Sequence, residues 1–191
     1  RELVKSYEQQ QTGHIRFNPQ CELRYYDQEL EQPQHAGTHF QYILQIEPDN
    51  VPALTSLELL LERFENWDEV VGVLRSKVDL VADPDERKAS YEKMARILRD
   101  HLGRADEAID AYQQVISLDG EDLKSLEALE RLYLEQQQWQ DLVGVLERKE
   151  NALTETGDIV DNLLRLGELY EGQLAAPDQA IEVYRRAIGY D

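Results

Sequence analysis

The chain has 191 residues, with 39 Asp and Glu against 20 Lys and Arg, and a formal net charge of −19 at pH 7. Nucleic acids and anionic membrane surfaces are polyanions bound through clustered Lys and Arg, so this acidic chain is a poor match for either partner. No apolar stretch is long enough to span a membrane, and a single cysteine, Cys21, excludes an internal disulfide.

Apolar residues recur at helical spacing along most of the chain, and no segment alternates apolar and polar residues as a half-exposed strand does. The sequence therefore predicts an all-α protein. In chain order, the spacing predicts helices near 20–31, 35–46, 51–65, 67–81, 85–101, 105–118, 123–136, 139–155, 159–173 and 177–189.

Residues that favour helix ends lie between these segments. We expect Asn50 and Asp122 to cap the helices that follow them, because their side-chain oxygens can accept hydrogen bonds from free backbone amides. Pro84 and Pro177 stand where a helix can begin, since the first turn needs no amide donor from them. Gly157 is expected to separate two helices.

The chain contains an internal repeat. A shift of 72 residues aligns 50–119 with 122–191 without a gap, and 17 of the 70 positions are identical. The matches are mainly apolar and include Leu54/Leu126, Leu57/Leu129, Leu60/Leu132, Trp67/Trp139, Val71–Leu74 with Val143–Leu146, Ala108/Ala180 and Tyr112/Tyr184. Each copy holds four predicted helices, or two hairpins. Because the two Trp repeat beside matched valines, we expect both to pack in the core.

The second hairpin of each copy carries a recognisable pattern of apolar and small residues. In the later copy these are Leu163, Leu166, Gly167, Tyr170, Ala180, Tyr184 and Ala187, and in the earlier copy Tyr91, Met94, Ala95, Leu98, Ala108, Tyr112 and Val115. The pattern resembles the tetratricopeptide repeat, a 34-residue helix–turn–helix unit with small residues where its helices cross. The other hairpins depart from it, since Glu58 and Glu130 replace the small residue.

The resemblance implies a right-handed α-solenoid of about five antiparallel hairpins, at about 20–49, 50–83, 84–120, 121–156 and 157–191. Residues 1–19 are interpreted as the end of a preceding repeat and an irregular linker. Arrays of this kind carry capping repeats with a polar outer face at their ends. Because we recognise no such cap at one or both ends, we expect this chain to be a piece of a longer array.

No residue set predicts catalysis. His35 and His39 share a helix face at a spacing that can chelate a metal, but a third ligand would have to be Cys21 or a distant carboxylate, and two surface histidines are the simpler interpretation. Cys21 is interpreted as a small buried thiol. The glycines form no phosphate-binding run. The sequence thus predicts no catalytic residues, no metal site and no cofactor.

The resemblance also implies where a partner binds, because the first helix of each hairpin lines the concave face in this family. The corresponding positions are Pro52, Thr55, Ser56, Leu59, Glu62, Arg63, Ala89, Glu92, Lys93, Arg96, Arg99, Asp100, Lys124, Glu127, Ala128, Arg131, Leu134, Glu135, Asp161, Leu164, Arg165, Glu168, Glu171 and Gly172. They hold eight acids and seven bases, so this surface is almost neutral within an acidic chain.

Six cations at these positions are the candidate peptide-binding residues: Lys93, Arg96, Arg99, Lys124, Arg131 and Arg165. Arg can hold a carboxylate through two parallel hydrogen bonds, so the set suits an acidic side chain or a peptide C-terminus. The alternative is that Arg96, Arg99 and Arg131 pair with acids on the same face, as neighbours on helix surfaces commonly do; these acids are Glu92, Glu127 and Glu135.

These observations favour a non-catalytic protein–protein interaction scaffold that binds a peptide or partner helix in its concave groove. The alternative is a regulatory or substrate-recruiting repeat region of a larger enzyme whose catalytic domain lies outside this chain. RNA binding by a related helical repeat is disfavoured by the net charge. Without a targeting pattern the cytoplasm is the default compartment, and the oligomeric state stays open.

Overall fold

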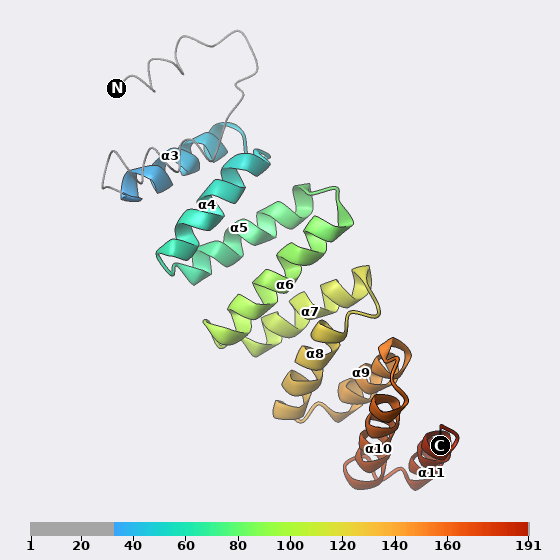
Figure 1. Cartoon of the computed structure of the whole chain (residues 1–191). Helices are drawn as coiled ribbons and strands as arrows, with labels where there is room; N and C mark the ends of the chain where they lie inside the picture. Colours follow the sequence, from blue (N-terminus) through green and yellow to red (C-terminus); the bar gives the residue numbers. More distant parts are fainter. Residues whose placement is uncertain (1–32, 191) are drawn as a thin grey trace. The chain divides into compact units, whose positions relative to one another are not determined.

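The computed structural model describes residues 33–190, and every regular element in that range is an α-helix (Figure 1). The helices are α3 (Pro33–Ile46), α4 (Val51–Arg63), α5 (Trp67–Leu80), α6 (Pro84–Asp100), α7 (Ala105–Leu118), α8 (Leu123–Glu135), α9 (Trp139–Ala152), α10 (Thr156–Gly172) and α11 (Pro177–Ile188). The predicted all-α class is confirmed. The predicted helix at 20–31, the segment 1–19 and Cys21 lie outside the described residues, as do the side chains of His35 and His39.

Most helix ends lie where the sequence predicts them. The side chain of Asn50 accepts a hydrogen bond from the amide of Ala53 at 2.9 Å, and that of Asp122 accepts one from the amide of Ser125 at 2.9 Å. Pro84 and Pro177 are the first residues of α6 and α11.

The prediction that Gly157 separates two helices is wrong, because Gly157 lies in the first turn of α10. Helix α9 ends earlier than predicted, at Ala152, and the extended backbone of Leu153 starts the connection to α10. The Leu153 side chain continues the apolar spacing of α9, so the pattern alone extended that helix too far.

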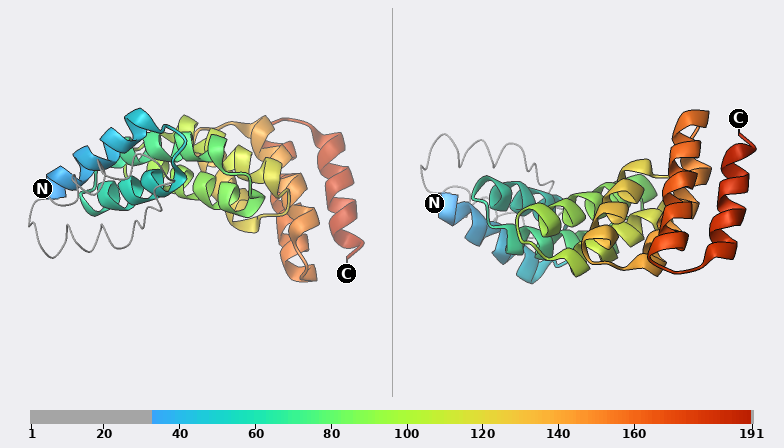
Figure 2. Two further views of the ribbon diagram at one scale, coloured as in Figure 1. Left: turned by 90° about the horizontal axis from the view of Figure 1, so that it is seen from above. Right: turned by 90° about the horizontal axis from the view of Figure 1, so that it is seen from below.

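The chain forms two compact units, and the boundary between them falls within α5, after Val73. In the first unit α3 packs against α4, with Phe40, Ile43 and Leu54 buried. In the second unit the packed pairs are α6 with α7, α8 with α9, and α10 with α11, and α7 and α9 also contact the first helix of the following pair. Figure 2 shows α10 and α11 side by side as an antiparallel pair.

Small residues allow the paired helices of the second unit to approach closely. A Cβ atom on Gly167 of α10 would overlap the ring of Tyr184 on α11. Ala95, at the same position of α6, is fully buried, and Ala180 of α11 is 2% exposed. The small residues therefore lie at helix crossings, as the family pattern predicts.

The turns that follow the first helix of each hairpin repeat with the same 72-residue period. Glu65 and Gln137 have φ values of 56° and 57°, and Gly103 and Ala175 have φ values of 63° and 49°. Each pair is related by the 72-residue shift, so two turn types alternate along the chain. Only glycine adopts this left-handed conformation without a steric penalty, so three of the four turns carry local strain.

The two Trp are buried less completely than predicted, since Trp67 and Trp139 are only half-buried. Each is the N-terminal residue of its helix, where fewer neighbouring side chains can cover a large ring. The valines beside them are buried, with Val71 at 3% and Val143 at 8% exposed.

Candidate functional site

The predicted lining positions lie mainly on the exposed sides of α4, α6, α8 and α10, but two do not. Ser56 is fully buried and donates its hydroxyl to the carbonyl of Pro52 at 3.0 Å, and Ala128 is 6% exposed. Both belong to the packed sides of their helices, where Ser56 is buried beside Leu57 in α4 and Ala128 beside Leu129 in α8. These buried sides are wider than the pattern of large apolar residues alone indicates.

Three of the six candidate cations lie on α6. Lys93 is half-buried and Arg96 is exposed. Arg99 donates two hydrogen bonds to Asp100, at 2.6 and 3.0 Å, and its guanidinium lies 5.9 Å from the centre of the Tyr112 ring. The hydrogen bonds to Asp100 raise the pKa of Arg99, partial burial opposes this, and electrostatic interactions with Tyr112 and Glu135 add smaller increases.

The other three candidate cations lie on α8 and α10. Lys124 and Arg131 are exposed on α8, and neither makes an ion pair with a residue in the described range. Arg165 on α10 pairs with Glu130 on α8 at 2.9 Å. The alternative pairing with Glu92, Glu127 and Glu135 is therefore wrong for Arg99, whose partner is Asp100.

A charged trio formed by Glu130, Lys149 and Arg165 was missed from the sequence. Glu130 binds Lys149 of α9 through one oxygen at 2.7 Å and Arg165 of α10 through the other at 2.9 Å. The side chains of Lys149 and Glu130 are only 12% and 15% exposed. The available signal was the identity of Glu130 and Lys149 with the residues 72 positions earlier, Glu58 and Lys77.

Another charged contact joins α6 to the start of α8. The ammonium of Lys88 lies 2.6 Å from Asp119 and 2.8 Å from Asp122. Hydrogen bonds to these two carboxylates raise the pKa of Lys88, and its hydrogen bond lowers the pKa of Asp119. The Lys88 contacts therefore link α6 to the start of α8, and the trio links α8 to α9 and α10.

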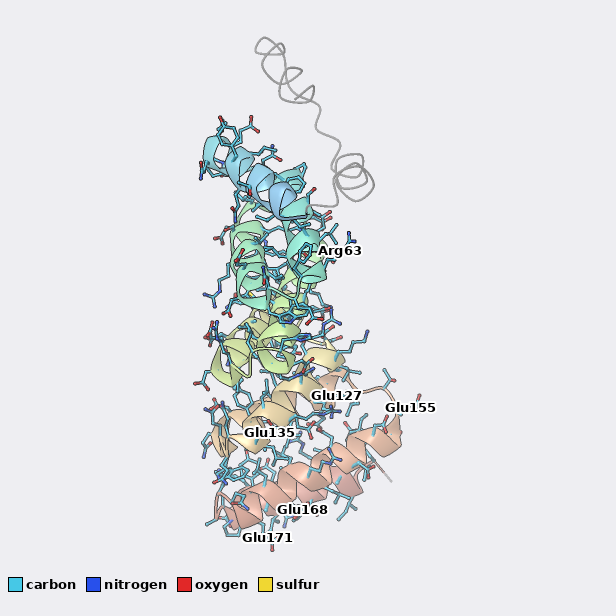
Figure 3. The ribbon with its side chains drawn as sticks, turned by 90° about the vertical axis from the view of Figure 1, so that its left-hand side faces the viewer. Arg63, Glu127, Glu135, Glu155, Glu168 and Glu171 are labelled. Carbon is cyan, nitrogen blue, oxygen red and sulfur yellow. The ribbon has the colours of Figure 1, made fainter. Side chains whose placement is uncertain are left out.

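Acidic side chains dominate the part of this surface formed by α8 and α10. Figure 3 shows Glu127 and Glu135 along α8, and Glu168 and Glu171 along α10. All four are exposed. Arg165 is paired with Glu130, which is not one of the lining positions, so the lining positions of α8 and α10 are more acidic than their own formal charges indicate.

Two large apolar side chains are exposed on the same pair of helices. Leu134 at the end of α8 is 56% exposed, and Leu164 in α10 is 43% exposed. Both stand at predicted lining positions, next to acidic neighbours. A surface with apolar side chains surrounded by charges is typical of a site that binds a peptide or helix.

Within the described range, no group of three or more His, Cys, Asp and Glu side chains is arranged to hold a metal ion. None of the helices described is long and apolar enough to cross a membrane.

Comparison with known proteins agrees with the geometry. Models described as tetratricopeptide repeat match residues 89–121, 125–156 and 161–190. The chain is a tetratricopeptide-like repeat protein. No curated protein matches it significantly.

Solved structures share its fold at low identity. A tetratricopeptide protein, YrrB, described as having an unusual peptide-binding site, is 12% identical with a TM-score of 0.53, over 100% of this chain and 93% of that one. MamA is 18% identical with a TM-score of 0.50, over 88% and 90%. A complex of Naa15 and Naa10 bound to HypK is 18% identical with a TM-score of 0.56, over 88% of this chain and 25% of that one. These likenesses show the fold, an all-α solenoid of helical hairpins.

Proposed function

We propose that this tetratricopeptide-like chain is a non-catalytic interaction scaffold that binds a partner peptide or helix along the exposed side of α6, α8 and α10. The observation that carries the proposal is the change of charge along these helices. Cations are available on α6 and α8, at Arg96 and Arg131, whereas α10 presents Glu168 and Glu171. Helical arrays expose long rigid surfaces that suit an extended partner.

The charge pattern and the exposed leucines define the expected partner. An acidic residue of the partner would face Arg96 and Arg131, and a basic residue would face the carboxylates of α10. Between them, apolar residues would cover Leu134 and Leu164, whose burial would add to affinity. YrrB, which shares this fold and is described as having an unusual peptide-binding site, agrees with this kind of partner.

Peptide selection followed by affinity measurement tests the proposal. Peptides are selected from a random display library on the full chain, and their Kd values are measured by fluorescence anisotropy. Replacing Leu134 and Leu164 together by Asp should weaken binding at least tenfold, because about 1.4 kcal/mol of lost apolar contact corresponds to a factor of ten. Ile181→Asp on α11, which is 49% exposed, is the matched control and should leave Kd unchanged.

A second pair of variants tests the cations. Reversing Arg96 and Arg131 to Glu should weaken the selected peptides about tenfold, with a smaller effect at high salt. Arg185→Glu on α11 changes the same kind of charge at an exposed position outside the surface. Equal losses in the surface variants and in the α11 variants would overturn the proposed surface.

A further inference from the structure

A small polar pocket opens on the second unit where α8, α9 and α10 meet. Its volume is about 210 Å³. It is lined by Glu127, Lys149, Leu153, Asp158, Asp161, Asn162 and Arg165. Three of these side chains are carboxylates, two are cations and one is a buried amide.

The amide of Asn162 leaves one acceptor without a donor. Asn162 is 3% exposed, and its Nδ2 donates to the carbonyl of Leu146 at 2.8 Å. Only the NH₂ group can donate to a carbonyl, so this contact assigns Oδ1 as the other atom of the amide. Oδ1 has no hydrogen-bond partner in the described part of the chain. A buried acceptor of this kind favours a ligand that brings an N–H donor.

The charges of the pocket favour a cationic ligand. The ammonium of Lys149 and the guanidinium of Arg165 already bind the two oxygens of Glu130, at 2.7 and 2.9 Å. The carboxylates of Glu127, Asp158 and Asp161 make no ion pair with any residue between 33 and 190. With Glu130 included, the carboxylates outnumber the cations by two.

We propose that this pocket binds the cationic end of an Arg or Lys side chain from the partner. The guanidinium or ammonium would donate to Asn162 Oδ1 and to the neighbouring carboxylates, which are the charge-assisted contacts that these groups form best. The inference rests on the proposed scaffold function and specifies which residue the partner places at α10.

An anionic ligand fits the same pocket poorly. A carboxylate would have to replace Glu130 on Lys149 and Arg165 while lying close to Glu127 and Asp161, and like charges at short range repel. It would also leave Asn162 Oδ1 without a donor. The pocket therefore discriminates by charge sign as well as by hydrogen bonding.

Nuclear magnetic resonance titration of the full chain tests the inference without a selected peptide. The probes are capped tripeptides with Arg, Lys, Glu or citrulline between two Ala residues, and citrulline is a neutral side chain of nearly the same shape as Arg. The Arg and Lys probes should shift the Asn162 side-chain amide signals in a saturable way. Saturable binding of the citrulline or Glu probe with equal affinity, or no saturable binding of the Arg and Lys probes, would overturn the inference.

Variants separate the pocket from general attraction to an acidic chain. Asp161→Asn and Glu127→Gln should each weaken the Arg probe about two- to fivefold, the range for partly exposed charge pairs. Glu182→Gln on α11 removes the same charge at an exposed position away from the pocket and should change nothing. Equal weakening by all three variants would mean that only net charge matters.

Glu130→Gln provides the opposite test. It keeps the shape of the side chain but leaves Lys149 and Arg165 without their counter-charge, so the Arg probe should bind more weakly and the Glu probe more tightly. Unchanged affinities for both probes would contradict the assigned charge balance. If the selected peptides bind through Leu134 and Leu164 while the Arg and Lys probes fail, the scaffold stands and the pocket assignment falls; if the selected peptides also fail, both fall.

Discussion

Replacing Glu130 by Ala should destabilise the second unit by more than the loss of an exposed ion pair. Glu130 and Lys149 are 15% and 12% exposed and lie 2.7 Å apart, so the variant would leave a largely buried ammonium without its partner. Breaking a fully buried pair costs roughly 3–5 kcal/mol, and the remaining exposure reduces this to about 2–3 kcal/mol here. The bond to Arg165, which is 64% exposed, adds at most about 1 kcal/mol.

Urea unfolding of the full chain, followed by circular dichroism, measures this loss of unfolding free energy. Arg165→Ala serves as the matched comparison, because it removes the same type of contact to Glu130 from an exposed position, and it should cost less than about 1 kcal/mol. Adding Lys149→Met to the Glu130→Ala variant removes the unpaired cation and should recover at least half of the loss.

Two results would refute the account of the trio. Equal costs for Glu130→Ala and Arg165→Ala would mean that burial does not strengthen the Lys149 contact. A double variant no more stable than Glu130→Ala would mean that the loss comes from packing and not from an unpaired buried charge. The slope of free energy against urea must stay constant for these comparisons to hold.

Three further predictions concern the turns, an exposed ion pair and a half-buried ring. Ala175→Gly should raise the unfolding free energy by about 0.5–1 kcal/mol, because Ala175 has a φ of 49° and glycine relieves that strain; a lower melting temperature would contradict this. Lys88→Met should lower stability at pH 7, and this loss should shrink as pH falls through the lowered pKa of Asp119, because the hydrogen bond from Lys88 stabilises the ionised carboxylate; a loss of equal size at every pH in urea titrations would argue against it. Trp139→Ala should cost about 1–2 kcal/mol in urea unfolding, below the range of about 3–5 kcal/mol for a fully buried ring, and a cost within that higher range would show that the ring is packed more fully than its partial burial indicates.

The helices and their order could be predicted from the sequence because local signals and packing agree. Apolar spacing places each buried stripe, and polar or proline residues such as Asn50, Asp122 and Pro84 mark the ends. The 72-residue repeat strengthens each assignment, since two copies of the same pattern must adopt the same local structure. The repeated left-handed turn at Glu65 and Gln137 shows that the equivalence extends to the backbone.

The residues of the candidate surface could be predicted only in part, because whether a side chain is exposed depends on how wide the contact between two packed helices is. Ala128 and Ser56 are small residues that periodicity cannot assign to one side of a helix, and tertiary packing buries both. Trp139 shows the opposite error, since a large apolar residue at a helix end is covered on fewer sides. Ion pairs between helices are equally hard to predict, because their partners are distant in sequence.

The charge of the binding surface depends on which charges are already paired within the chain. A formal count treats Arg165 as available to a ligand, but its contact with Glu130 commits it to the junction of α8 and α10. The Glu130 position looks like a departure from the repeat pattern, yet 72 residues earlier the chain has Glu58, with Lys77 and Lys93 at the positions of Lys149 and Arg165. An acid at this position, with two cations at fixed spacing, is therefore a repeated element of this chain. Because it neutralises Arg165, the surface of α8 and α10 should select a basic residue in its partner.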